Sequence, residues 1–368
     1  MMAETCERLV QAGVPLWRAA VFVRTLHPDI FGHSFVWRPG AEVVVSRADF
    51  DVRESPEFKN NPLAILYRTG QEVRYRLDDP ASQGFPFFDD MRGEGVTDYI
   101  ALPLFFTEGS IHSSSWTTRR PGGFSDEHLD GLRALMKPMA RIIEIIDLRR
   151  TASILLDTYV GNRAGERILG GQIRRGHTDI MHAAIWLSDL RGFTALSDRL
   201  PSETVVDILN RYFDCQVSSI RTHGGEVLKF MGDGLLAVFP IAEQDGNVQE
   251  VCAAVLEAAR ESRASVDAMH YPIGEAVERF RFGVALHVGQ ILYGNIGGGN
   301  RLDFTCIGPA VNLAARLEKI AGRLSRTIVA SEGFARIGGS WSDLGEFPIA
   351  GFSKAERVYG LLDEAPQR

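Results

Sequence analysis

The chain has 368 residues, of which 45% are hydrophobic and 24% charged, a composition typical of soluble proteins with a buried core. Single cores seldom grow past about 250 residues, so this length indicates two domains. The net charge of −7 argues against a nucleic-acid partner, because nucleic-acid-binding domains usually present a basic surface.

Neither the start of the chain nor its cysteines point to export. No apolar run approaches the ~20 residues that a membrane span needs. Glu4 and Glu7 stand where a signal peptide would be basic and then apolar. The four cysteines lie far apart without a C-x-x-C pair, which is typical of reduced core residues rather than a zinc site or disulfide framework. We therefore expect a cytoplasmic protein with no membrane span.

The first 125 residues have the pattern of a mixed α/β domain. Apolar residues at helical spacing from Cys6 to Ala20 predict a helix. Strand-like runs broken by Pro and Gly follow at residues 19–23, 36, 42–46, 73–76, 99–106 and around Trp116. The order A-L-P-L-F-F, strand at Trp116, F-S-D-E-H-L-D-G-L resembles the last third of a GAF domain, a family of small-ligand sensors. The resemblance implies a regulatory domain that receives an unknown small-molecule or protein signal.

Aromatic side chains of this region have two interpretations. They could line a ligand pocket, but aromatic residues at strand spacing are more often core, and nothing here has ligand spacing. We favour the core for Trp37, Phe85, Phe87, Phe88, Tyr99, His112 and Trp116.

A long helix is predicted next. Ser125 suits its N-cap, and apolar residues then recur every three or four positions. They are Leu129, Leu132, Leu135, Met136, Met139, Ile142, Ile143, Ile146, Ile154 and Leu155, with Pro138 between them. This length favours a parallel coiled-coil seam between two chains, and the alternative is a helix packed on its own domain. Glycines at 161, 165, 170, 171 and 176 then predict a linker, so residues 126–177 form a signalling helix and linker.

Two aspartates mark the start of the second domain, residues 178–368. Asp189 follows the apolar run 183–187, which predicts a buried strand, and precedes a Gly-Phe-Thr break. Asp233 lies in Met-Gly-Asp-Gly between two short apolar runs, which predicts the tip of a hairpin. If the hairpin pairs beside the first strand, both carboxylates reach one sheet edge, where they could bind Mg²⁺.

The remaining elements predict an α+β fold with helices over a sheet. Helices are expected from Ser202, with Val205, Val206, Leu209, Tyr212 and Phe213 on one face, and over 248–268. Strands are expected at 282–288 and 291–295. Gly308 and Pro309 open a last helix, on which Asn312 and Arg316 lie one turn apart on one face.

Four blocks in this order carry a resemblance: L-S-D-L-R-G-F-T, L-K-F-M-G-D-G-L-L-A-V-F, A-L-H-V-G-Q-I-L-Y-G-N-I-G and T-C-I-G-P-A-V-N-L-A-A-R-L-E. Together they resemble the catalytic domain of class III nucleotidyl cyclases. The resemblance implies a ferredoxin-like palm and formation of a 3′,5′-cyclic nucleotide with release of pyrophosphate.

The resemblance also implies residue roles. Asp189 and Asp233, with the Leu190 carbonyl, would hold two Mg²⁺ or Mn²⁺ ions. Asn312 would orient the ribose, and Arg316 would stabilise charge at the α-phosphate. Further substrate contacts fall on Gly192, Phe193 and Thr194. The family implies a homodimer, in which one chain supplies the aspartates and the other supplies Lys229, Thr305, Asn312 and Arg316.

Lys229 and Thr305 match the pair that reads adenine in the bacterial branch of the family. A lysine donates to a ring nitrogen, and a hydroxyl can accept from the exocyclic amine. In guanylate cyclases of the family, Glu and Cys occupy these two positions instead. We therefore expect that the substrate is ATP and that the protein is an adenylate cyclase. The alternatives are a guanylate or other nucleotide cyclase, and a degenerate signalling module, although a degenerate module would lack a key Asp, Asn or Arg.

Overall fold

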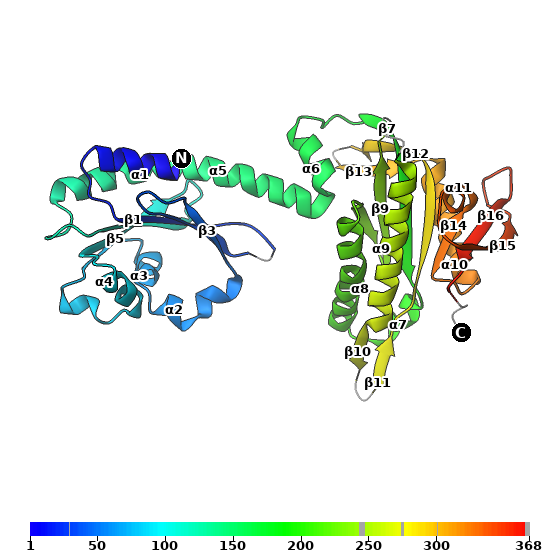
Figure 1. Ribbon diagram of the computed structural model, residues 1–368, viewed down its shortest axis with the longest axis horizontal. Helices are drawn as coiled ribbons and strands as arrows, with labels where there is room; N and C mark the ends of the chain where they lie inside the picture. The colour runs from blue at the N-terminus through cyan, green and yellow to red at the C-terminus, as the bar shows by residue number, and fades with distance from the viewer. Residues whose placement is uncertain (29, 243–246, 274–275, 300, 365–368) are drawn as a thin grey trace. The chain divides into compact units, whose positions relative to one another are not determined.

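The computed structural model describes residues 1–28, 30–242, 247–273, 276–299 and 301–364. It divides into two compact units, Met1–Leu155 and Leu156–Arg368, drawn in Figure 1. No helix in these described ranges has the length and apolar character needed to cross a membrane. The predicted division at residues 125 and 177 stays a prediction.

The N-terminal unit contains a six-stranded antiparallel sheet of order β3-β2-β1-β6-β5-β4. The strands are β1 (Arg18–Arg24), β2 (Gly32–Trp37), β3 (Val44–Ala48), β4 (Val73–Arg76), β5 (Asp98–Phe105) and β6 (Ile111–Thr118). The α-helices are α1 (Met2–Gln11), α2 (Pro56–Lys59), α3 (Pro62–Thr69), α4 (Asp89–Gly93) and α5 (Asp126–Val160), whose end lies beyond the Leu155 boundary of this unit. Short 3₁₀ turns are η1 (Phe50–Glu54), η2 (Pro80–Ser82) and η3 (Pro86–Phe88). The predicted mixed α/β content is confirmed, whereas the GAF-like assignment stays a prediction.

Helices cover both faces of this sheet (Figure 1). On one face, α1 and the first half of α5 pack over Trp37, Ile100 and Trp116. On the other, α3 and α4 pack over Tyr99 together with Phe88. All seven side chains that we interpreted as core are buried or partly buried, so the core interpretation is confirmed.

The helix predicted over residues 6–20 is wrong in extent. Helix α1 ends at Gln11, and β1 begins at Arg18. Gly13 adopts a φ of +94°, a left-handed conformation that ends helices, and Pro15 has no N–H to continue one. Beyond Gly13, the apolar residues that fitted helical spacing lie in a connecting segment and in the first residues of β1.

Helix α5 begins where predicted but packs differently. The Ser125 hydroxyl accepts from the His128 backbone N–H at 3.4 Å, and the helix runs on through Pro138. The seam prediction is wrong for the first half of α5, since its own domain covers many of its apolar side chains. Buried against that sheet are Leu129, Leu132, Met136, Ala140 and Ile143, whereas Ile142, Ile145, Ile146 and Leu148 are exposed.

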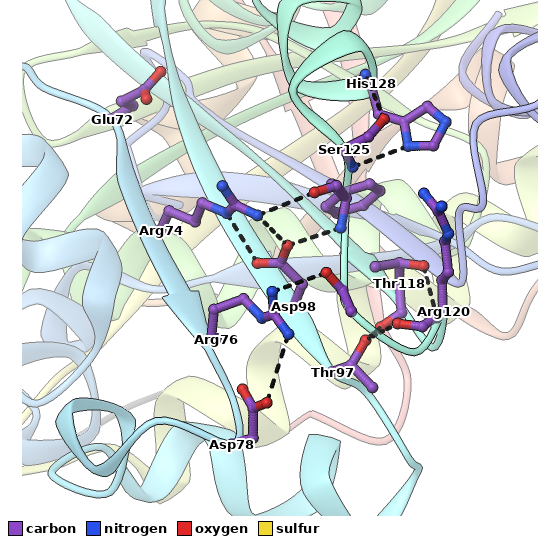
Figure 2. A network of polar contacts seen from close by, with 12 residues as sticks. Glu72, Arg74, Arg76, Asp78, Thr97, Asp98, Thr118, Arg120, Ser125 and His128 are labelled. Atoms are coloured by element: carbon purple, nitrogen blue, oxygen red, sulfur yellow. Dashed lines mark hydrogen bonds and ion pairs between the residues drawn. The ribbon is translucent and has the colours of Figure 1, made fainter.

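A buried carboxylate ties the start of α5 to strands β4 and β5 (Figure 2). Asp98 is fully buried and accepts from Arg74 Nη2 at 2.7 Å and from the Phe124 backbone N–H at 2.9 Å. A Cβ at Gly123, where φ is +72°, would collide with Asp98. Arg76 donates to the carbonyl of the neighbouring Gly122 at 2.8 Å. Because a buried charge must be paired, this network fixes the turn from which α5 starts.

The C-terminal unit contains an eight-stranded sheet of order β15-β16-β14-β12-β7-β9-β8, with β13 paired to β12. Only the β12–β14 pair is parallel among the described pairs. The strands are β7 (Thr178–Leu190), β8 (Glu226–Met231), β9 (Gly234–Ile241), β12 (Phe282–Gly298), β13 (Arg301–Ile307), β14 (Ile328–Ser331), β15 (Trp341–Phe347) and β16 (Glu356–Leu361). Strands β10 (His270–Ile273) and β11 (Ala276–Arg279) pair separately. The helices are α6 (Asn162–Leu169), α7 (Phe193–Arg199), α8 (Ser202–Thr222), α9 (Val248–Ala268), α10 (Pro309–Arg323) and α11 (Glu332–Ala335).

Strand β7 lies inside this sheet and is buried on both sides. Ala184 and Trp186 face the core shared with α8 and α9, whereas Ala183 and Ile185 face the core shared with α6 and α10. Figure 1 shows α8 and α9 on one side of the sheet and α10 on the other. This two-sided burial explains why the sequence of β7 is a continuous apolar run rather than an alternating one.

Three predictions for this unit need correction. The strands predicted at 282–288 and 291–295 are one strand, β12; Gly289 pairs with Ala183 within it, and a Cβ there would lie 2.8 Å from the Cβ of Ala310. Because Gly289 has no side chain, α10 can approach β12 closely, and the strand continues through this residue. The predicted linker contains a helix, α6, with Ala164 buried. Val206, predicted on the packing face of α8, is 55% exposed.

Candidate active site

Asp189 lies at the end of β7, as predicted. Asp189 pairs with Gly234 of β9 on one side and with Gly283 of β12 on the other. Both paired residues are glycines, so neither of them has a side chain beside the carboxylate. The apolar residues before Asp189 anchor the strand between two cores and leave its polar end at the sheet edge.

Asp233 lies at the tip of the hairpin formed by β8 and β9, also as predicted. Gly232 before it has a φ of +67°, which L side chains rarely adopt. Because Gly234 pairs with Asp189, the hairpin brings the two carboxyl groups together. The pKa of the Asp189 carboxyl is raised to about 7, first by burial and then by the negative charges of Asp233 and Glu318.

This arrangement fits a divalent cation. Two carboxylates so close resist joint ionisation unless a positive charge compensates them. In the described part of the chain, no cluster of three or more His, Cys, Asp or Glu side chains could hold a metal ion. A site here would use Asp189, Asp233 and the carbonyl of Leu190, and would leave ligand positions to water and substrate oxygens.

We predict that cation affinity depends on pH. A Mn²⁺ ion bound there would have to displace the proton from Asp189, whose pKa is raised to about 7. The apparent affinity for Mn²⁺ should therefore fall about tenfold from pH 8 to pH 6. Isothermal calorimetry of the full chain measures this, and an equal affinity at both pH values would contradict it. Because folding raises this pKa, the metal-free fold should also lose stability as pH rises from about 4 to 7.

Asn312 and Arg316 lie where the sequence predicted, on one exposed face of α10. Gly308 precedes the helix with a φ of +141°, and Pro309 is its first residue. Both side chains are exposed. Among the described residues, no hydrogen bond or ion pair joins either side chain to Asp189 or to Asp233.

Lys229 and Thr305 lie on neighbouring surfaces of β8 and β13. The Lys229 ammonium forms an ion pair with Asp303 Oδ2 at 2.5 Å, and Asp303 is two residues before Thr305, on the same face of β13. Thr305 is buried. Lysine, carboxylate and hydroxyl together offer both donors and acceptors to the edge of a base.

The remaining predicted site residues follow β7. Gly192, with a φ of +74°, precedes α7, which starts at Phe193. Thr194 is exposed and Phe193 is partly buried. Gly192, Phe193 and Thr194 lie two to four residues beyond Leu190. They belong to a segment that we call the metal loop, Asp189–Thr194.

Sequence reasoning missed two charged residues beside the site. Arg191 lies within the metal loop and donates from Nη1 to Glu318 Oε1 at 2.6 Å. Glu318 comes from α10 and is only 5% exposed. A signal for Glu318 was available in the sequence. This charged residue lies in a helix between Leu317 and Ile320, which are both buried. It also missed Asp303, the partner of Lys229.

Comparison with known proteins agrees with this geometry. Residues 177–353 match the family model of the adenylate and guanylate cyclase catalytic domain. The chain is 31% identical over 190 residues to the terminal-differentiation-specific adenylate cyclase of Dictyostelium discoideum, covering 49% of this chain and 8% of that one. It is 28% identical over 165 residues to an adenylate cyclase of Anabaena cylindrica, covering 45% and 32%. The chain thus spans less than a third of either relative's length.

A solved structure shows the shared fold. The chain resembles a bacterial light-regulated adenylyl cyclase with a TM-score of 0.51 at 20% identity, covering 72% of this chain and 86% of that one. At this identity the likeness concerns the fold alone. Residues 177–353 of this chain therefore belong to the family of adenylate and guanylate cyclase catalytic domains.

Proposed function

We propose that the chain is an adenylate cyclase that converts ATP to 3′,5′-cyclic AMP and pyrophosphate as a homodimer. The observation that carries the proposal is the meeting of Asp189 and Asp233 at one sheet edge. During cyclisation, negative charge must be stabilised at two oxygens, the attacking 3′-oxygen and the leaving pyrophosphate oxygen. The paired carboxylates would bind the cations that stabilise this negative charge.

The bonds that change are few. The ribose 3′-oxygen forms a bond to the α-phosphorus, and the bond from that phosphorus to the bridging oxygen breaks, so that pyrophosphate departs with both bonding electrons. The hydroxyl proton passes from the 3′-oxygen to solvent water. Two Mg²⁺ or Mn²⁺ ions, when bound, would lower the pKa of the hydroxyl and neutralise the leaving group. Asp189, Asp233 and the Leu190 carbonyl would hold them.

Groups on α10 would act at the other side of the nucleotide. The Arg316 guanidinium is permanently charged, and its planar fork matches phosphate oxygens. The Asn312 amide, one turn earlier, can hold the ribose so that its 3′-oxygen lies in line with the leaving group. Gly192, Phe193 and Thr194 would contact the triphosphate from the metal loop.

Lys229 and Thr305 would select adenine. The lysine donates to the ring nitrogen N1, and the threonine hydroxyl accepts from the exocyclic amine. In guanine the same edge carries a donor at N1 and an oxygen acceptor, so the lysine loses its acceptor. The ion pair with Asp303 would keep the ammonium on this face before the nucleotide binds.

The N-terminal unit would regulate this reaction. Its helix α5 continues to Val160, and the Asp98 network fixes the start of α5 to the sheet. We propose that a small-molecule or protein signal binds to this GAF-like domain and changes the conformation of α5. This change would alter the activity of the cyclase domain. The exposed residues of α5, Ile142, Ile145, Ile146 and Leu148, remain available for a seam between two chains.

One assay tests the activity directly. The purified chain is incubated with each of the four ribonucleoside triphosphates and Mg²⁺ or Mn²⁺, and the products are identified by mass. We expect cyclic AMP from ATP as the main product. Cyclic GMP as the main product would favour a guanylate cyclase, and no cyclic product with any nucleotide would favour a degenerate signalling module.

A double substitution tests base selection. Lys229→Glu with Thr305→Cys should lower the use of ATP relative to GTP, because the donors and acceptors of the pocket are inverted. Only the ratio of kcat/KM values is predicted, since simultaneous pocket changes lower activity in general. The charge reversal Lys59→Glu in the N-terminal unit is the control. An unchanged ratio in a double variant that remains active would mean that other residues read the base.

A further inference from the structure

We propose that Arg191 is a positioning residue: it holds Glu318 away from the cation positions of Asp189 and Asp233 and fixes the metal loop to α10. The inference rests on the proposed function, because it assumes that the two aspartates bind divalent cations. It concerns a residue whose role lies in arranging the site rather than in touching the nucleotide.

The contacts of Arg191 are specific. Its Nη1 donates to Glu318 Oε1 at 2.6 Å, and its Nη2 donates to the Glu318 carbonyl at 3.4 Å. Its own backbone N–H donates to the Arg281 carbonyl at 2.8 Å. The residue is thus held at both ends: the main chain by the segment before β12, and the side chain by α10.

Two glycines make room for the guanidinium. A Cβ at Gly283 would overlap Arg191 Nη2, and a Cβ at Gly322 would lie 3.0 Å from Arg191 Nη1. Gly283 belongs to β12 and pairs with Asp189. Gly322 lies one turn after Glu318 on α10. The guanidinium therefore occupies a slot that has space only because both positions lack a side chain.

The charges explain why the slot matters. Arg191 connects Glu318 to the neighbourhood of Asp189, because its guanidinium pairs with Glu318 and lies against Gly283, the β12 residue that pairs with Asp189. Glu318 is almost fully buried, so without a cation partner its carboxylate would be uncompensated. An uncompensated negative charge in this neighbourhood would add to the charge that a divalent ion at the two aspartates experiences. Arg191 satisfies Glu318 and so reserves the ion for the two aspartates.

Removing one partner or the other should therefore shift cation affinity in opposite directions. In Arg191→Gln, the uncompensated Glu318 adds negative charge, so Mn²⁺ should bind about tenfold more tightly. In Glu318→Gln, the uncompensated guanidinium adds positive charge, so Mn²⁺ should bind about tenfold more weakly. Both variants should lose turnover, because the metal loop is no longer tied to α10. Damage to the fold alone would weaken binding in both.

Calorimetric titration of the full chain with Mn²⁺, without nucleotide, tests the inference. The double variant Arg191→Gln/Glu318→Gln should return to within about threefold of the parent affinity, since the two charges cancel. Arg191→Lys keeps the charge and should keep the affinity, while turnover falls because lysine lacks the planar fork. Arg199→Gln is the matched control, because it removes an arginine of α7 that pairs with Glu278 at the surface.

The outcomes separate this inference from the proposed function. If the parent binds Mn²⁺ and Asp233→Asn abolishes binding, the cation site stands, and equal or same-direction shifts in the two single variants would overturn the role of Arg191 alone. If Glu318→Gln does not fold, the sign of the shift in Arg191→Gln and the behaviour of Arg191→Lys still decide. If Asp233→Asn binds Mn²⁺ as the parent does, the proposed function itself is wrong.

Discussion

Replacement of Asp233 by asparagine is expected to lower turnover by on the order of a hundredfold or more while the chain stays folded. Asp233 lies at a hairpin tip, outside the cores on either side of the sheet, so the fold does not depend on its charge. The amide keeps the shape of the side chain but removes the negative charge that would hold a cation beside Asp189. Steady-state kinetics with ATP at saturating Mn²⁺ measure the effect.

The control for this substitution is another aspartate of the same unit. Asp214 is exposed on α8, and Asp214→Asn should leave turnover within about twofold, as expected of a surface change. Thermal unfolding of both variants checks that each is folded. Turnover of Asp233→Asn within tenfold of the parent at saturating metal would rule out the two-carboxylate site.

Local pattern was enough to predict the two aspartates. Asp189 follows a run buried on both sides, and Asp233 lies between glycines that permit a tight turn. Both features are encoded within about ten residues of the chain, and the pairing of Asp189 with Gly234 follows once the hairpin joins the strand. The same holds for Asn312 and Arg316, whose common face is fixed by the helix period.

Contacts between distant segments could not be predicted in the same way. Arg191 and Glu318 are 127 residues apart in sequence. The helical position of Glu318 suggested burial, but no local pattern identified Arg191 as its partner. Lys229 and Asp303 are 74 residues apart. Their pairing depends on which strands become neighbours in the sheet, and periodicity does not specify that order.

The errors in helix α5 and strand β12 have one cause. Apolar periodicity shows that a face is buried but not which partner buries it, so Leu132 and Met136 fitted a dimer seam as well as they fit the sheet of their own unit. Gly289 fitted a break as well as it fits the close approach of Ala310. In both cases the tertiary neighbour decided between two local interpretations.

Mixing two inactive variants is expected to restore activity. If each active site takes its aspartates from one chain and Asn312 and Arg316 from the other, then Asp189→Ala and Arg316→Ala damage opposite halves. A heterodimer of the two variants contains one site with both defects and one intact site. With free exchange, about half of the dimers are mixed, so the mixture should recover about a quarter of parent turnover.

Two side chains that this arrangement assigns to the partner's site lie at the surface of the chain. Asn312 and Arg316 are exposed, and among the described residues neither contacts Asp189 or Asp233 through a hydrogen bond or ion pair. A second chain related by a two-fold axis would complete both sites at once. The magnitude of the expected loss in each single variant is large, because a reacting group misplaced by about 1 Å can cost a hundredfold in rate.

The matched control mixes Asp189→Ala with Asp233→Ala. Both substitutions damage the same half-site, so every combination of these chains leaves each site without one aspartate, and no activity should return. Subunit exchange is verified in parallel by co-purification of two differently tagged chains. If exchange is complete and the Asp189→Ala/Arg316→Ala mixture stays at the activity of the separate variants, the aspartates and Arg316 do not come from different chains, and the site must be completed within one chain.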